Sequence, residues 1–327
     1  MLEERRRKML IFLFISCILL ALSVLAAIYF GSTKIPLSEI IKIIFYHENS
    51  DFSIIIWDIR MPRIILALIV GANLAASGAL LQAVIQNPLA DPGIIGISSG
   101  AKLGLLLALL IFPQFVTAAP LFAFAGAMGA AVLVYLLAWK GGVKTVRLIL
   151  AGVAVNAFFA GVSYLITILN NDKIQNIMLW LSGNLSGRSM YDVKLILPYS
   201  LIGLAAALAA IRPSNLLLFG DEKAGSLGLN ITRSRILISL TASFLAAIST
   251  SLVGVISFVG LVIPHIVRLI TGPNYKYLLP LSILNGGIFL LIADTFARTI
   301  AAPIELPVGT LMALVGGPFF VYLLRRK

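Results

Sequence analysis

Long apolar runs separated by short polar stretches cover most of this chain. The runs lie near residues 9–30, 64–84, 94–112, 118–138, 148–169, 193–211, 236–256, 258–270, 278–298 and 307–324. A helix needs about 20 predominantly apolar residues to cross the hydrocarbon core of a bilayer, and most of these runs approach that length. The pattern predicts an all-α, polytopic membrane protein with about ten transmembrane helices, built from residues 1–327 as a single transmembrane domain.

The number of spans depends on residues 236–270, where hydrophobicity is nearly continuous and is interrupted at Gly254, Gly260 and Pro264. This stretch can be interpreted as one long helix or as two. Both ends of the chain are basic, which places both in the cytoplasm under the positive-inside rule. Because two ends on one side require an even number of spans, we expect ten.

Composition supports a membrane location. Hydrophobic residues make up 60% of the chain and charged residues 12%, whereas soluble domains carry about 25% charged residues. The net charge of +12 does not point to nucleic acid, because the basic residues lie mostly between the apolar runs and not on one solvated face. The single cysteine, Cys17, allows no intrachain disulfide.

Residues 71–104 form two apolar stretches, rich in small residues, on either side of a polar break at 86–93. Lipid offers backbone groups no hydrogen-bond partner, so this break is expected to pack inside a helical assembly. Gly71 and Gly78 would let neighbouring helices approach closely.

The sequence carries no motif for bond-breaking chemistry. It has no GxxxxGK[ST] loop, no HExxH and no cluster of cysteine and histidine, so we expect no metal or cofactor, and any ATP would be used by another subunit. An intramembrane enzyme is therefore poorly supported.

A proton-coupled secondary transporter is a second alternative. Such a transporter needs a titratable group within the membrane, and Asp294 and His265 are the only candidates for that role. A structural role is favoured for His265, as a partner for carbonyls freed at a helix break. Asp294 is equally compatible with a functional role and with a structural i,i+4 pair with Arg298.

Two polar regions are candidates for contact with other proteins. Arg60 and Arg63 precede the second run and Arg298 ends the ninth, all on the outer side of the predicted topology. They could bind carboxylates of an acidic protein or anchor the chain to lipid phosphate. On the inner side, the longest loop is 212–235, where Asp221 is a good helix N-cap. A short helix there could enter a cleft on another protein or simply connect two spans.

A faint internal repeat relates the two halves. Arg63 begins an apolar stretch that reaches Leu-Ala-Ala at 74–76, and Arg235 begins one that reaches Leu-Ala-Ala at 245–247. The first starts outside and the second inside, which is the plan of an inverted repeat. Chance similarity between spans rich in alanine and leucine is the alternative.

Several segments follow one another in the order of a known family. They are RMPR at 60–63, the stretch 71–104 with NPLADP at 87–92, LAGV at 150–153, WLSGNL at 180–185, GDE at 220–222, SLG at 226–228, FVGLVIPHIVR at 258–268, DTFAR at 294–298 and ELPVGT at 305–310. In these segments the chain resembles the iron-siderophore, haem and cobalamin permease family, the FecCD-type membrane subunits of type II ABC importers.

The resemblance implies a set of partners. Two copies of the chain would form a homodimer with a translocation path between them, although pairing with a paralogous permease stays open. Two ATP-binding cassette ATPase subunits would bind the cytoplasmic side and a substrate-binding protein the outer side. The chain would be a multi-pass protein of the cytoplasmic (inner) membrane with both termini in the cytoplasm, binding no cofactor itself and leaving ATP to its partner.

The resemblance also implies roles for residues of this chain. Arg60, Arg63 and Arg298 match positions that receive acidic residues of the binding protein. The ATPase-coupling segment matches Gly220, Asp221, Glu222, Ala224, Gly225, Ser226, Leu227 and Gly228. Thr145 and Val146 match the cytoplasmic gate, where Val146 departs from the polar pair of the cobalamin branch. Gly152, Asn156 and Gly161 match the pathway.

The predicted function is therefore the permease subunit of an ATP-driven importer. The ATPase would move the 220–229 helix, and the chain would form the conduit without breaking bonds. The expected cargo is an iron-siderophore complex or a related large metal chelate, because that branch of the family is largest. Haem and cobalamin are the alternatives.

Overall fold

The computed structural model describes residues 2–31, 33, 35–46, 50, 52–140, 142, 144–170, 177 and 180–325. The basic residues 326 and 327, which contribute to the predicted topology, lie outside this part of the chain. Helices account for nearly all regular structure in the described residues, as the apolar runs predict.

The helices follow the predicted runs and add several short ones between them. They are α1 (Leu2–Tyr29), α2 (Leu37–Phe45), α3 (Met61–Ile85), α4 (Ile97–Leu106), α5 (Ala119–Ala138), α6 (Thr145–Leu169), α8 (Met190–Ala209), α9 (Ile211–Leu217), α10 (Asp221–Ser226), α11 (Ile231–Val253), α12 (Val259–Thr271), α13 (Tyr275–Ala297) and α14 (Val308–Arg325). In the described residues, seven helices are long and apolar enough to cross a membrane, and three shorter apolar helices lie at Ile97–Ile111, Val259–Thr271 and Val308–Val321. The all-helical, polytopic architecture of about ten helices is confirmed.

The stretch 236–270 forms two helices. α11 ends at Val253 and α12 begins at Val259. The backbone between them reverses through positive φ angles of 81° at Gly254 and 70° at Phe258. A Cβ atom at Gly254 would lie 1.9 Å from the carbonyl oxygen of Trp180. Only glycine allows the two backbones to approach this closely, so the packing of Gly254 against Trp180 fixes the position of the break between α11 and α12.

The helix that holds the second run begins earlier than its apolar residues suggest. A π-helical turn, η1 (Ile55–Arg60), continues directly into α3. Pro62 has no backbone N–H and lies in the first turn of α3, where proline is tolerated. Arg60 and Arg63 therefore lie within a continuous helix and not in a loop before it.

The polar break after α3 lies partly inside the assembly. Gln86 ends α3 in the left-handed conformation, with φ of 55°, and remains exposed. The chain then turns inward through the 3₁₀ turn η2 (Pro92–Ile95), in which Asp91 Oδ1 accepts a hydrogen bond of 2.8 Å from the backbone N–H of Gly93. Ala90 is fully buried.

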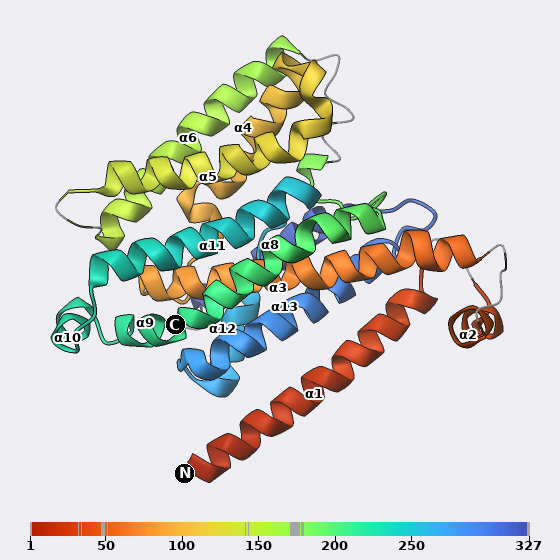
Figure 1. The fold of residues 1–327 in the computed structure, drawn as a ribbon, viewed down its shortest axis with the longest axis horizontal. Helices are drawn as coiled ribbons and strands as arrows, with labels where there is room; N and C mark the ends of the chain where they lie inside the picture. Colours follow the sequence, from red (N-terminus) through yellow and green to blue (C-terminus); the bar gives the residue numbers. More distant parts are fainter. Residues whose placement is uncertain are drawn as a thin grey trace.

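The core is formed by α3, which packs against α11 and α13 (Figure 1). Contacts made by Gly71, Ala75 and Gly286 bring α3 and α13 together backbone to backbone. Such close approach through small residues is typical of membrane helix interfaces. α4, α5 and α6 contact one another and form a group on one side of the molecule, and α1 packs against α13 at the other.

The two ends of the bundle differ. Figure 1 shows α10 at one end of the long axis and α2 at the other, with both chain termini toward the end that carries α10. We refer to these as the α10 end and the α2 end. The two central helices α3 and α11 run antiparallel, so α3 starts at the α2 end and α11 at the α10 end. Asn73 contacts Ser249, whereas Ser77, further along α3, contacts Ala242, earlier in α11.

Candidate functional site

Arg63 holds three segments together at the α2 end. Its Nε and Nη2 atoms donate hydrogen bonds of 2.8 and 2.9 Å to the two carboxylate oxygens of Asp294 in α13. Its Nη1 atom donates a bond of 2.6 Å to Glu305, which precedes α14. A guanidinium bound by two parallel hydrogen bonds is held in orientation as well as in distance. Arg63 therefore fixes the start of α3 to α13 and to the chain before α14.

Arg60 and Arg298 bind the end of α1 from the same region. Arg298 Nη2 donates a hydrogen bond of 2.6 Å to the carbonyl oxygen of Ala27, and Arg60 donates to the carbonyl oxygens of Ile28 and Tyr29. The last carbonyls of a helix have no partner within that helix, and arginine side chains near a helix C-terminus satisfy them favourably. These contacts secure α1 to the bundle.

The three arginines thus lie together, as expected, but they are buried. Their exposed fractions are 3% for Arg60, 4% for Arg63 and 2% for Arg298. The expected pair of Asp294 with Arg298 is present only at 4.0 Å, since the carboxylate of Asp294 is taken by Arg63. In this state the guanidinium groups face partners in their own chain. Their role in receiving a binding protein stays a prediction.

A second arginine–carboxylate pair lies at the α10 end. Arg235, in the first turns of α11, donates hydrogen bonds of 2.9 and 2.8 Å to the two oxygens of Asp221. The sequence favoured Asp221 as an N-cap, which is wrong: α10 begins at Asp221, the cap position is Gly220, and no side chain caps this helix. Asp221 uses its carboxylate for Arg235 because the loop folds back onto α11.

The loop around α10 exposes apolar side chains. Ala224, within α10, is buried, whereas Phe219 and Leu227 on either side of the helix are each 61% exposed. The helix ends at Ser226, and the chain then turns at Gly228, which has φ of 84°. The N–H of Leu229 donates a hydrogen bond of 3.1 Å to the carbonyl oxygen of Ala224. The result is a short helix whose own exposed residues are mostly polar, flanked by the exposed apolar side chains of Phe219 and Leu227. Such a surface can enter a cleft on another protein.

The predicted gate and pathway residues all lie along α6. Thr145 begins the helix and is half-buried, and Val146 is exposed. Asn156 donates a hydrogen bond of 3.0 Å to the carbonyl oxygen of Gly93 and accepts one of 2.6 Å from Ser99, so it ties α6 to the turn before α4. Gly152 packs against the backbone of Ile94, whereas nothing lies within 4 Å of a Cβ atom built at Gly161.

Comparisons with known proteins identify the class to which this arrangement belongs. A model described as the FecCD transport family matches residues 19–326. This chain belongs to that family. It is 42% identical over 296 residues to the Fe(3+)-citrate import system permease protein YfmD of Bacillus subtilis, covering 90% of this chain and 89% of that protein. It is 45% identical over 275 residues to the cobalamin import system permease protein BtuC of Halobacterium salinarum, covering 84% of this chain and 74% of that protein.

A solved structure agrees with the fold. A metal-chelate type ABC transporter in an inward-facing conformation superposes with a TM-score of 0.82 at 28% identity, covering 98% of this chain and 100% of that one. The FecCD permease described here is therefore the membrane subunit of an ABC importer and is itself non-catalytic. The prediction of function class from the sequence is confirmed.

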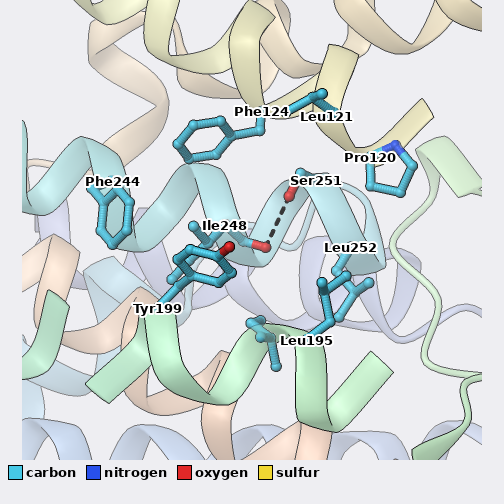
Figure 2. Close-up of a pocket in the computed structure, with 10 residues that line it drawn as sticks. Pro120, Leu121, Phe124, Leu195, Tyr199, Phe244, Ile248, Ser251 and Leu252 are labelled. Atoms are coloured by element: carbon cyan, nitrogen blue, oxygen red, sulfur yellow. Dashed lines mark hydrogen bonds between the residues drawn. The ribbon is translucent and has the colours of Figure 1, made fainter. Parts of the chain in front are cut away.

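An apolar groove in this FecCD permease lies apart from these clusters. Its volume is about 330 Å³, and it lies between α5, α8 and α11 (Figure 2). Figure 2 shows Phe124, Phe244 and Tyr199 around it, and the hydroxyl of Ser251 is turned to the carbonyl oxygen of Ile248. No charged side chain lines the groove. It therefore offers no opposite charge that would pair with a charged metal chelate.

Sequence reasoning missed two partners in these clusters, Glu305 and Arg235. The available signal was their charge beside apolar runs, because a charged residue at the edge of a membrane span needs a partner within the protein. His265, the other candidate for ion coupling, is buried in α12. In the part of the chain that the structure describes, no group of three or more histidine, cysteine, aspartate or glutamate residues could hold a metal ion.

Proposed function

We propose that this permease forms one half of the membrane conduit of an importer for an iron chelate of the citrate or siderophore type. The observation that carries the proposal is its likeness, over most of both chains, to a permease of an iron-citrate import system and to a metal-chelate transporter. Cobalamin is the second candidate, favoured by the relative from Halobacterium salinarum. Haem remains an alternative.

The proposed partners are a second permease, two ATPase subunits and a substrate-binding protein. The ATPase subunits would bind the α10 end, where Phe219 and Leu227 expose apolar side chains around a short helix. α6 carries exposed apolar residues along its length, including Leu150, Phe158 and Leu165, which supports a path or a second permease along this helix. The second permease is a copy of this chain or a paralogue.

We place the α10 end in the cytoplasm and the α2 end outside a cytoplasmic membrane. This orientation is supported by the position of both chain termini at the α10 end (Figure 1) and by the basic residues near those termini. The substrate-binding protein would then dock at the α2 end, above the buried arginines.

Reconstitution tests this function directly. Proteoliposomes containing the permease, its ATPase subunits and the cognate binding protein should take up radioactive ferric citrate or a ferric siderophore. Uptake should require ATP and the binding protein and should persist when a protonophore removes the proton gradient. Cobalamin supplied in place of the iron chelate separates the two candidate cargoes. Accumulation by the permease alone would refute the proposal.

A further inference from the structure

The pair formed by Arg235 and Asp221 is unusual among the loop contacts because one partner is buried and the other faces water. The side chain of Arg235 is 3% exposed and that of Asp221 is 50% exposed. Both carboxylate oxygens are bound at hydrogen-bond distance. Surface ion pairs are weak because water and salt compete for the charges. Here, burial of the guanidinium and its two parallel bonds favour a single orientation.

The same carboxylate also lies next to the end of α3. Gln86, the residue that terminates α3, donates a hydrogen bond of 2.7 Å to the carbonyl oxygen of Leu217 and a longer one of 3.5 Å to Asp221. Asp221 therefore connects α10 to the beginning of α11 and approaches the end of α3. α3 and α11 pack against each other through the core.

We propose that the ion pair of Asp221 with Arg235 is the link that transmits movement of α10 to α11, and that Arg235 is a positioning residue for coupling. The inference rests on the proposed function, in which the α10 loop contacts the ATPase. Within α10 only Ala224 is buried, so little apolar packing holds this helix against α11, and the ion pair adds a directional contact between them. A planar guanidinium held at two points passes on both displacement and rotation, which a point charge does not.

The opposite end of the core supports this interpretation. Arg63 in the first turn of α3 binds Asp294 with the same two-point geometry. Because α3 and α11 are antiparallel, each of the two helices is held near its N-terminus, one at each end of the bundle. A core held in this way can carry a displacement from the α10 end to the α2 end as a unit.

The decisive variant is Arg235→Lys, which keeps the positive charge and removes the two-point geometry. Reconstituted with the ATPase subunits and the binding protein, it should assemble and retain basal ATP hydrolysis. The number of substrate molecules imported per ATP should fall by about 2-fold to 30-fold, the range expected when coupling between distant sites is perturbed. Stimulation of hydrolysis by the loaded binding protein should fall with it.

A neutral pair, Asp221→Asn with Arg235→Gln, covers the case in which the lysine variant does not fold. It retains polar, hydrogen-bonding groups at both positions without a buried uncompensated charge, and it should show the same loss of coupling. The matched control is Glu39→Gln in α2, which removes an exposed ion pair with Lys42 at 3.1 Å and should leave uptake per ATP unchanged.

Three outcomes would overturn the inference. The first is uptake per ATP equal to that of the control in both Arg235→Lys and the double variant, with assembly intact. The second is loss of ATPase binding, which would make the pair part of the docking surface and not a transmitter. The third is failure of both variants to fold, which would assign the pair to folding.

A further variant separates this inference from the proposed function. Leu227→Asp places a charge on the exposed apolar surface of the loop and should abolish binding of the ATPase subunits. If Leu227→Asp assembles and transports normally, the proposed ATPase contact is wrong, whatever the results for the variants of Asp221 and Arg235.

Discussion

At the scale of single residues, four arginines near the ends of the spans bind partners within the chain. A charge in or beside the hydrocarbon region is costly unless it is paired. Arg63 and Arg235 each bind an aspartate, whereas Arg60 and Arg298 bind carbonyl oxygens at the end of α1. These side chains therefore stabilise the permease in the state described here, in addition to any contact that they make with partner proteins.

The first prediction concerns Arg63. Replacing it with alanine leaves Asp294, which is 1% exposed, as a buried unpaired carboxylate, and removal of one partner of a buried pair costs about 3–5 kcal/mol. Thermal unfolding in detergent should shift clearly to lower temperature. Lys42→Ala is the control, because an exposed pair contributes less than about 1 kcal/mol. Unchanged stability of Arg63→Ala, together with weaker binding-protein affinity, would instead favour docking as its principal role.

At the scale of helices, packing depends on a few glycines where two backbones meet. A Cβ atom at Gly78 in α3 would lie 1.9 Å from the carbonyl oxygen of Gly260 in α12. These two helices can hold their separation only while both positions lack a side chain. Gly129 in α5 is different, since nothing lies within 4 Å of a Cβ atom there.

The second prediction compares these two glycines. Gly78→Ala forces α3 and α12 apart and should destabilise the permease by about 1–3 kcal/mol, as overpacking of a filled core does. Gly129→Ala should be neutral or stabilising by up to about 1 kcal/mol, because alanine favours the helix over glycine. Thermal unfolding of the two purified variants makes the comparison. Equal stability of both variants would show that α3 and α12 can move apart at little cost in free energy.

At the scale of the whole molecule, orientation in the membrane decides which surfaces meet which partners. The α2 end carries the cluster of Arg60, Arg63 and Arg298, and the α10 end carries the exposed loop and both chain termini (Figure 1). If the α10 end is cytoplasmic, the loop is accessible only to cytoplasmic proteins, and the surface that covers the buried arginine cluster is accessible only to proteins outside.

The third prediction tests this orientation by cysteine labelling. Cys17 is the only cysteine, so Cys17→Ser provides a background without thiols. Tyr46→Cys beyond α2 and Phe219→Cys beside α10 each replace an exposed side chain. A membrane-impermeant maleimide should label the first in intact cells and the second only after permeabilisation. The reverse pattern, or labelling of both in intact cells, would contradict the proposed topology.

Much of the fold could be predicted from sequence because hydrophobicity along the chain is a local property. The apolar runs predicted about ten helices, and Gly254 marked the break that separates α11 from α12. Less of the candidate site could be predicted. Arg63 and Asp294 are 231 residues apart, and nothing local to either residue indicates that they are partners. The same holds for Asp221, whose local context suggested a helix cap.

The sequence by itself determined that the chain is a membrane-embedded helical permease. Composition, the length of the apolar runs and the short family segments are properties of the sequence that do not depend on how the helices pack. Only the tertiary structure decided which charged residues are exposed and which are bound. An arginine at the edge of a span can face a partner protein, lipid phosphate or its own chain, and the choice depends on whether packing brings a carboxylate or a helix end within reach.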